Sequence, residues 1–363
     1  MREKKKNIFM KKEFLISLSL LFLFSGNKNA YGIDEQARMT SVAADYSGLR
    51  LIPYGKTSGI KLFADGIMVV ELTAIATENG PVSKAAEAGI KEGDMITHVN
   101  GIKINSTEHF QSMMEKCGGS SVSLTISRDK KVLNISVTPS KTTGDGKYRI
   151  GAYVRDSMAG IGTITFIDPV TGMFGALGHG ICDMDTGKLM PFSSGSIVES
   201  KVTSVKKGIS GNPGELRGEF DNSGDMGIFF SNTDKGIYGK ITDPGVYSSL
   251  KAIPVARKSE IKEGRATIIC NINGNECESF EIEISKIYDI GPGGEKNMQI
   301  TVTDQRLLSR TGGIVQGMSG SPVIQNGKLV GAVTHVLIND PQKGYAIFIE
   351  NMLQNIKLNK VAA

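Results

Sequence analysis

The chain of 363 residues is 40% hydrophobic and 22% charged, a balance typical of a soluble globular protein of about two domains. Residues 1–13 hold six basic and two acidic side chains, so most of the net charge of +5 lies there and the remainder is nearly neutral. This composition excludes disorder as the main state, and it excludes the broad basic surface of a nucleic-acid binder. The 44 glycines favour β-structure with many tight turns.

An apolar stretch, residues 14–24, follows the basic N-terminus. It is shorter than the ~20 residues with which a helix crosses a bilayer, and it fits the ~7–15 apolar residues of a secretory signal. A cut after Ala30 would place Lys28 at the unfavourable −3 position, so retention as a membrane anchor is the alternative. We expect a signal or anchor segment over 1–32 and a linker over 33–47, with the rest of the chain exported.

Residues 48–139 combine short strands with two helices. A strand over 66–72 precedes a short helix that ends at Gly89, where a left-handed cap costs glycine little. A second helix begins near Asn105, and an alternating hairpin follows with its turn at Asp129-Lys130. The segment resembles a PDZ domain of the bacterial protease-associated type through Pro81, Ala88-Gly89-Ile90, Gly93-Asp94 and Val99-Asn100-Gly101.

The PDZ resemblance implies a peptide-binding loop before the 66–72 strand. Backbone N–H groups of that loop would hold the C-terminal carboxylate of a peptide or protein, and the adjoining edge would accept a peptide strand. A PDZ fold that serves only as an internal spacer or brake is the alternative. The loop expected to bind the peptide comprises Ser58, Gly59, Ile60, Lys61 and Leu62.

Residues 140–363 show many short strands and frequent glycines, which predicts an all-β barrel or sandwich domain. Within it, Ser319 lies in a Gly-Met-Ser-Gly-Ser-Pro sequence, just before a hairpin whose turn is Asn326-Gly327. A nucleophilic serine needs an exposed hydroxyl and nearby N–H donors, which Gly317 and Ser319 could supply as an oxyanion hole. An ordinary glycine-serine turn is the competing interpretation.

A nucleophilic serine also needs a base, and the chain has only four histidines. Two of them, His98 and His109, lie in the PDZ-like segment and are expected to be structural. His179 lies in a glycine-lined turn and is the better candidate for the general base, whereas His335 lies inside an apolar strand and is expected to be packed there.

The spacing of residues along the chain does not decide which carboxylate orients the base. It also does not decide whether the cysteines form a disulfide. Candidates for the carboxylate are Asp304, Asp183 and Asp185. Cys270 and Cys277 flank a predicted hairpin turn at Asn273-Gly274, which would place them opposite each other as a disulfide or as two packed thiols. The absence of a CxxC motif argues against a structural zinc site.

Long motifs resemble the stage IV sporulation protein B (SpoIVB) serine peptidase family, a distant relative of the chymotrypsin-like proteases. The resemblance covers nearly everything from Gly48 to about Asn355, with the PDZ domain before the peptidase. It implies His179 as base, Asp304 as orienting carboxylate and Ser319 as nucleophile, with no metal or cofactor. The motifs that carry it are 148–151, 160–163, 175–179, 183–185 and 313–336.

The expected fold is therefore mainly β, with a PDZ-like α+β domain over 48–139 and a chymotrypsin-like β-barrel serine peptidase domain over 140–363. The resemblance implies an exported endopeptidase that signals during endospore formation, in the space between forespore and mother cell. It would cleave itself and a membrane-tethered regulatory protein, so that a late mother-cell transcription factor can be activated. A general quality-control protease and a non-catalytic PDZ scaffold are the alternatives. Membrane contact is expected through the N-terminal segment, and no nucleic acid is expected as partner.

Overall fold

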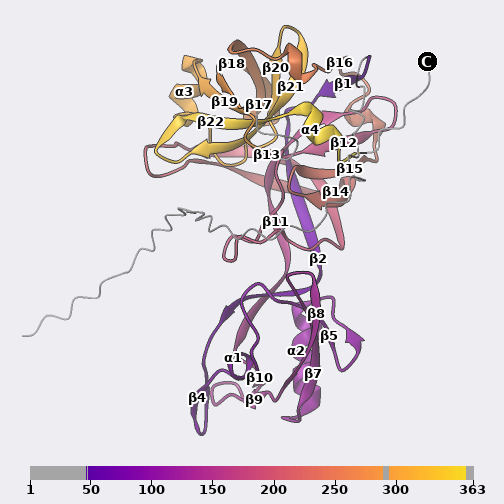
Figure 1. Ribbon diagram of the computed structural model, residues 1–363, viewed down its shortest axis with the longest axis vertical. Coiled ribbons are helices and arrows are strands. Elements are labelled where there is room, and N and C mark those ends of the chain that lie inside the picture. Colours follow the sequence, from indigo (N-terminus) through magenta and orange to yellow (C-terminus); the bar gives the residue numbers. More distant parts are fainter. Residues whose placement is uncertain (1–45, 47, 289–293, 357–363) are drawn as a thin grey trace, which may run out of the picture. The chain divides into compact units, whose positions relative to one another are not determined.

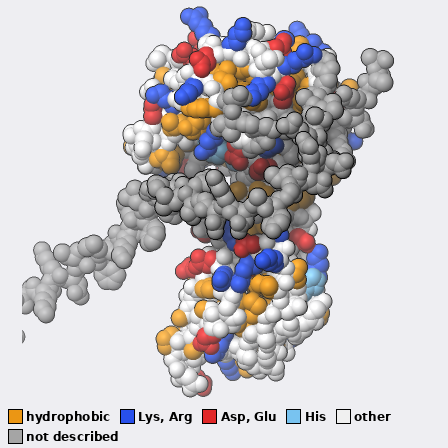
Figure 2. Space-filling view, viewed as in Figure 1, with side chains coloured by type: hydrophobic (Ala, Val, Ile, Leu, Met, Phe, Trp, Pro, Cys, Tyr) orange, Lys and Arg blue, Asp and Glu red, His pale blue; other side chains and the backbone are white. Residues whose placement is uncertain are grey.

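The computed structural model describes residue 46 and residues 48–288 and 294–356 (Figure 1). The expected signal or anchor segment lies outside the described residues, as does nearly all of the expected linker. Among the helices of the described part, none has the length and apolar character needed to cross a membrane. Figure 2 shows acidic and basic side chains interspersed on the visible face rather than gathered by sign.

The PDZ-like part is built around helix α2 (Thr107–Cys117), which Ser106 caps at its N-terminus through a side-chain bond from the His109 N–H. Gly118 ends the helix in the left-handed conformation, as a C-terminal cap requires. The apolar face of α2 buries Phe110 and Met114 against the sheet. The other elements are β3 (Ile75–Thr77), β4 (Gly80–Val82), α1 (Lys84–Glu87), β5 (Met95–Val99), β6 (Ile102–Lys103), β7 (Val122–Arg128), β8 (Lys131–Val137), β9 (Ser140–Lys141) and β10 (Tyr148–Arg149).

Two local predictions for this part are confirmed. Asp129 and Lys130 both adopt positive φ, 49° and 65°, in the turn that joins β7 to β8, which is the backbone of a two-residue hairpin turn. Gly89 follows α1 with φ 83°. The core of this part extends beyond the expected boundary at 139, because Ile150 is buried in it and Ala152 and Val154 pack against it.

The expectation of a peptide-binding loop at Ser58–Leu62 is wrong. These residues lie inside the long strand β2 (Thr57–Leu72), which pairs with β11 (Ala152–Ile167) on one edge and with β13 (Ser194–Lys206) on the other. Paired strands on both edges engage the backbone groups of β2, so this segment cannot offer free N–H groups to a carboxylate. The prediction failed because both partner strands lie far along the chain.

Two rings of six strands form the peptidase part. In the first, β2, β11, β12, β15, β14 and β13 pair in that order, and the β11–β2 pairing closes the ring. In the second, β17, β18, β19, β22, β21 and β20 form a closed barrel. The fold is therefore mainly β with a barrel peptidase domain, as expected. The remaining elements of the first ring and its flanks are β1 (Arg50–Pro53), β12 (Met173–Ala176), β14 (Glu215–Thr233), β15 (Gly236–Ile241), η1 (Pro244–Val246) and β16 (Ile253–Pro254).

The second barrel surrounds a core that includes Phe280 and Phe348. Its turn at Asn326-Gly327 has φ values of 51° and 73°, as the hairpin prediction requires. The elements are η2 (Lys258–Glu260), β17 (Gly264–Asn273), β18 (Glu276–Ile287), β19 (Met298–Val302), α3 (Gln305–Thr311), β20 (Pro322–Gln325), β21 (Lys328–Leu337), β22 (Asp340–Phe348) and α4 (Ile349–Leu353).

The β17–β18 hairpin does not place its cysteines opposite each other. A register shift pairs Asn271 with Cys277 and Cys270 with Glu278, so the two cysteines occupy staggered positions. Cys270 is buried, Cys277 is exposed and both are free thiols. The expected turn at Asn273-Gly274 is displaced by one residue, because Asn273 pairs with Glu276, and a register shift follows between Asn273 and Asn271, so the cysteines lie opposite other residues.

Candidate active site

Ser319 lies in a tight turn that only glycine permits on either side. Gly317 and Gly320 both have φ 96°, and a Cβ on Gly320 would lie 2.0 Å from the carbonyl oxygen of Thr163. The turn is fixed from the first ring, because the Thr163 hydroxyl donates to the Gly317 carbonyl at 2.8 Å. The half-buried Ser319 hydroxyl donates to the Thr334 carbonyl at 2.9 Å.

Two backbone donors are available beside the serine. Within the described residues, neither the Gly317 N–H nor the Ser319 N–H has an acceptor, whereas the N–H groups of Met318 and Gly320 donate to Val315 and Val333. An oxyanion hole requires uncommitted donors of this kind near the nucleophile.

His179 follows β12 in a turn that packs on the same strand as the serine. A Cβ on Gly178 would lie 2.9 Å from Thr334 Cγ2, so this turn touches the residue whose carbonyl holds Ser319. His179 Nδ1 lies 2.9 Å from the Gly180 carbonyl, which can only accept, so Nδ1 carries the proton and Nε2 is left as the acceptor. Burial lowers the His179 pKa, which keeps the imidazole neutral and able to take a proton.

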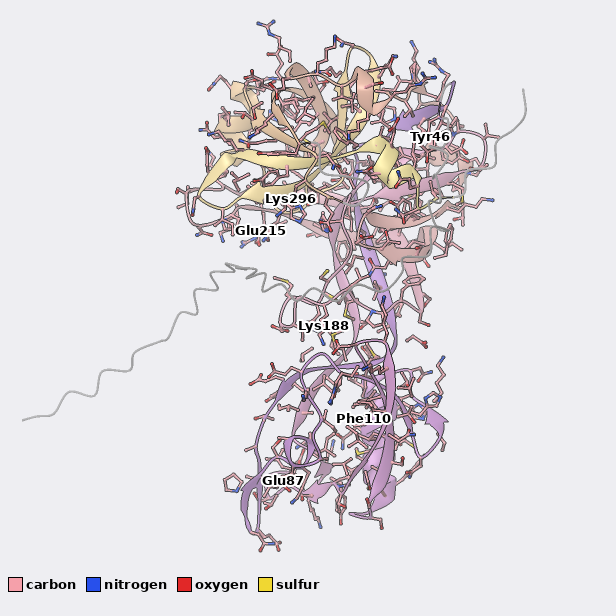
Figure 3. All side chains as sticks on the ribbon, in the orientation of Figure 1. Tyr46, Glu87, Phe110, Lys188, Glu215 and Lys296 are labelled. Atoms are coloured by element: carbon pink, nitrogen blue, oxygen red, sulfur yellow. The ribbon has the colours of Figure 1, made fainter. Side chains whose placement is uncertain are left out.

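His335 is not simply packed in its strand. It lies on β21 as expected, but its ring centroid is 5.4 Å from that of His179, with the rings tilted by 41°. Its Nε2 is 3.7 Å from Glu295 Oε2, and its buried Nδ1 has no partner among the described atoms. The His335 pKa is lowered to about 4, chiefly by burial and further by the nearby His179 and Lys296. Lys296 is labelled in Figure 3.

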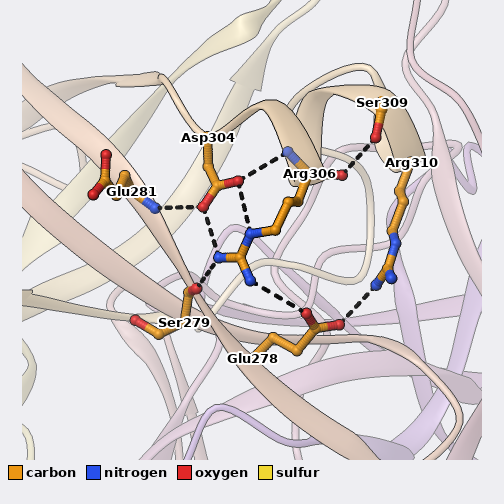
Figure 4. Close-up of polar contacts among 7 residues, drawn as sticks. All are labelled: Glu278, Ser279, Glu281, Asp304, Arg306, Ser309 and Arg310. Atoms are coloured by element: carbon orange, nitrogen blue, oxygen red, sulfur yellow. Dashed lines mark hydrogen bonds and ion pairs between the residues drawn. The ribbon is translucent and has the colours of Figure 1, made fainter.

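Asp304 makes its hydrogen bonds with residues other than the two histidines. It caps α3, accepting from the Arg306 N–H at 2.9 Å, and its carboxylate also binds the Arg306 guanidinium at 2.8 Å and the Glu281 N–H at 3.2 Å (Figure 4). These bonds, chiefly the one from Arg306, lower the Asp304 pKa to about 2. In the described part of the chain, no hydrogen bond or ion pair joins Asp304 to His179, His335 or Ser319.

The other two candidate carboxylates hold the loop after His179 rather than its ring. Asp183 is fully buried and binds Arg155 of β11 together with the Thr186 N–H. Asp185 binds the same guanidinium at 3.0 Å. The structure thus places the turn before His179 and the Ser319 hydroxyl against Thr334, and it places His335 beside His179. Among the described residues, no aspartate contacts either histidine.

A groove lies between α2 and the start of β11 in the PDZ-like part. It has a volume of about 780 Å³, and Phe110 (labelled in Figure 3), Met114 and Ile150 form its apolar lining. Among the described residues, the N–H groups of Ile150 and Gly151 at its end have no acceptor. This loop, rather than 58–62, has the free donors that a peptide carboxylate needs.

Comparisons with known proteins agree with this architecture. The family model of the SpoIVB peptidase S55 matches residues 146–353, and that of the PDZ domain matches residues 77–128. The chain belongs to the SpoIVB peptidase S55 family. The S55 peptidase region follows an N-terminal PDZ domain, and the expected family and domain order are confirmed.

Beyond its family models, this S55 peptidase shares shorter similarities with other proteins. It is 39% identical over 77 residues to the regulator of sigma-W protease RasP of Bacillus subtilis, covering 21% of this chain and 18% of that protein, so the chain spans about a fifth of that relative's length. The PDZ domain of an SdrC-like protein from Listeria monocytogenes superposes with a TM-score of 0.20 at 20% identity, over 25% of this chain and 87% of that one. The Rv3671c protease of M. tuberculosis superposes with a TM-score of 0.30 at 16% identity, over 58% of this chain and 78% of that one.

Two features described above were not predicted from the sequence pattern: the histidine pair and the groove along α2. The histidine pair was missed because His335 follows an apolar run that indicates only a strand. The groove was missed because Tyr148–Gly151 was assigned to the peptidase domain. The sequence signal for the groove is the Ile150-Gly151 pair directly before β11. Among the described residues, no group of three or more His, Cys, Asp or Glu side chains is placed to hold a metal ion.

Proposed function

We propose that this S55 peptidase is an endopeptidase in which Ser319 attacks the peptide carbonyl and His179 accepts the serine proton. The observation that carries the proposal is the meeting of the Ser319 hydroxyl and the His179 turn at Thr334. The N–H groups of Gly317 and Ser319 would bind the oxyanion, each contributing about 3 kcal/mol to the transition state. His179 would then protonate the leaving amine, and water would release the acyl group.

The hydroxyl must turn for this reaction. In the described state it donates to the Thr334 carbonyl, so attack requires it to rotate away from Thr334 and donate to His179 Nε2. Such tightening on substrate binding is common, because catalytic hydrogen bonds are often incomplete in the absence of substrate. Asp304 enters the proposal as orienting carboxylate through the family resemblance alone, and it would have to exchange Arg306 for the imidazole.

The biological role follows the same resemblance. The proposed enzyme is exported from the forespore and acts in the space between forespore and mother cell, tethered by or released from its N-terminal segment. It cuts itself and a membrane-tethered regulatory protein, which permits late transcription-factor activation. The PDZ groove between α2 and β11 is proposed to receive a peptide or protein C-terminus through Ile150 and Gly151.

A fluorophosphonate probe tests the chemistry most simply, because it reacts only with an activated serine. We expect the exported part of the chain to be labelled on Ser319, the Ser319→Ala variant to be unlabelled, and Ser321→Ala to be labelled like the parent. Ser321 is the matched control because it is fully buried two residues further on. Equal labelling of parent and Ser319→Ala would refute the assignment, and an unlabelled parent would favour the scaffold.

A further inference from the structure

We propose that one free strand edge, residues 152–161 of β11, guides the C-terminal tail of a substrate from the PDZ groove to Ser319. We call these residues the guide edge. The inference rests on the proposed peptidase function, and it adds a substrate class: proteins with an extended, unfolded C-terminal tail, cut at a set distance from the carboxylate.

The guide edge is open along its length. β11 pairs with β2 from Ala152–Leu72 to Thr163–Thr57, and on its opposite edge the pairing with β12 begins only at Ile164. Within the described chain, no strand covers the opposite edge before that point. Ala159 and Gly160 are exposed there (Figure 1 shows β2 and β11 as long neighbouring strands). An uncovered edge offers a row of N–H and C=O groups to which an extended peptide can add as a further strand.

One end of the guide edge is suited to a carboxylate. The uncommitted N–H groups of Ile150 and Gly151 immediately precede β11, at the mouth of the apolar groove along α2. Gly151 has φ 79°, and a Cβ there would lie 2.4 Å from the Thr73 carbonyl oxygen, so this close approach of the backbone requires glycine. The pair of donors complements the negative charge of a chain terminus.

The other end of the guide edge joins the catalytic turn. The Thr163 N–H points to the side away from β2 and donates to the Ser319 carbonyl at 3.1 Å. Because strand residues alternate, and the register runs without a shift from Ser157 to Thr163, the N–H groups of Ile161 and Ala159 point to the same side. The same edge therefore leads from free donors to the nucleophile.

The geometry sets the direction and length of the bound tail. An antiparallel tail with its carboxylate at Ile150 and Gly151 runs upstream along the guide edge toward Ser319. Ten residues from Ala152 to Ile161 span about 33 Å at ~3.3 Å per residue. With allowance for the register shifts after Tyr153 and Arg155, the scissile bond falls roughly 10–14 residues before the C-terminus.

The test uses the exported part of the chain and an unfolded carrier protein that ends in four apolar residues. Segments of six residues are inserted in steps just before those four, and the cut is mapped by mass spectrometry. We expect cuts to remain roughly 10–14 residues from the C-terminus whatever was inserted, and amidation of the terminus to slow cleavage at least about tenfold. Cuts that stay with one sequence, or indifference to amidation, would overturn the guide.

A variant separates the guide from the chemistry. Ala159→Pro removes one N–H from the guide edge and spares the ladder to β2, and proline is tolerated at such edge positions. We expect it to lose the tail-dependent rate while fluorophosphonate labelling of Ser319 is unchanged, and the control Ala159→Thr to keep both. Labelled enzyme that leaves every carrier uncut contradicts the guide, whereas unlabelled enzyme contradicts the proposed function itself. Should Ala159→Pro not fold, the insertion series decides alone.

Discussion

The Thr163 hydroxyl donates to the Gly317 carbonyl at 2.8 Å, and this bond joins the first ring of strands to the serine turn of the second barrel. The Thr163 N–H adds a second bond, to the Ser319 carbonyl, at 3.1 Å. Thr163 itself is fully buried. One residue of β11 thus fixes the turn on both sides of Met318, and the position of the uncommitted Gly317 and Ser319 N–H groups depends on it.

Replacing Thr163 with valine keeps the shape and removes the hydroxyl. We expect a loss of about 1 kcal/mol in the free energy of unfolding, because the Gly317 carbonyl loses its donor. We also expect kcat to fall about tenfold, since the loosened turn misplaces the oxyanion donors. Denaturant unfolding and cleavage of an unfolded carrier protein measure the two effects.

Thr165→Val is the matched control for this change. The Thr165 hydroxyl is buried on the same strand and has no partner among the described atoms. Replacing an unsatisfied hydroxyl with a methyl group is expected to leave stability unchanged or raise it, and to leave kcat unchanged. Equal effects of the two substitutions would show that the Thr163–Gly317 bond does not position the turn.

Gly320→Ala is expected to destroy the site. The new Cβ would lie 2.0 Å from the Thr163 carbonyl oxygen, and both atoms are on backbones that cannot easily move. We expect destabilisation by about 3 kcal/mol and loss of probe labelling. Gly327 also has positive φ, but a Cβ added there would have no atom within 4 Å. Gly327→Ala is therefore expected to lower stability by only about 1 kcal/mol. Thermal unfolding of the pair checks this, and similar losses would contradict the packing.

Asp304→Asn tests the orienting carboxylate. If Asp304 serves His179 as proposed, kcat falls by about 10⁴ at unchanged fold, because an amide cannot stabilise the imidazolium. Arg306→Gln is the comparison, since it removes the main partner of Asp304 and leaves the carboxylate in place. The proposal predicts a far greater loss of kcat for Asp304→Asn than for Arg306→Gln. Comparable small losses, with lowered stability in both variants, would reduce Asp304 to a helix cap.

The folded protein should lose stability in mild acid through His335. Its pKa is about 4 in the folded state, below the ordinary value of about 6.5, so the unfolded chain takes up a proton that the folded chain resists. The resulting loss in the free energy of unfolding begins as pH falls below about 6.5 and levels off below about 4. Glu295, whose pKa burial raises, contributes in the opposite sense.

His335→Gln isolates that contribution, because Glu295 is common to both proteins. We expect the thermal midpoint of the parent to fall more between pH 7.5 and pH 5 than that of the variant. Solvent at this partly exposed side chain reduces the effect below that of a fully buried group. Parallel curves for the two proteins would show that His335 is not held neutral by the fold.

Features set by short-range sequence were predictable. The turns at Asp129-Lys130 and Asn326-Gly327 and the cap at Gly89 depend on the conformational preferences of two or three residues. Ser319 and His179 stay predictions, which rest on the glycine-rich flanks of the serine and on the scarcity of histidines. The resemblance supplied the family, which the family models confirmed.

Features set by distant pairing were not predictable. Ser58–Leu62 looked like a loop because neither β11 nor β13, which enclose it, is near in sequence. The closeness of His335 to His179 depends on how β21 meets the turn after β12. Two local features were also missed: the β17–β18 turn lies one residue later than expected, which staggers Cys270 and Cys277, and Arg306 binds the Asp304 carboxylate, which the residue pattern does not specify.

The most direct test is a crystal structure of the protein after reaction with a small fluorophosphonate. The account predicts a bond from phosphorus to Ser319 Oγ, with the phosphoryl oxygen within hydrogen-bond reach of the Gly317 and Ser319 N–H groups and His179 Nε2 near Oγ. An adduct whose oxygen faces solvent, or whose serine is served by a group other than His179, would contradict it.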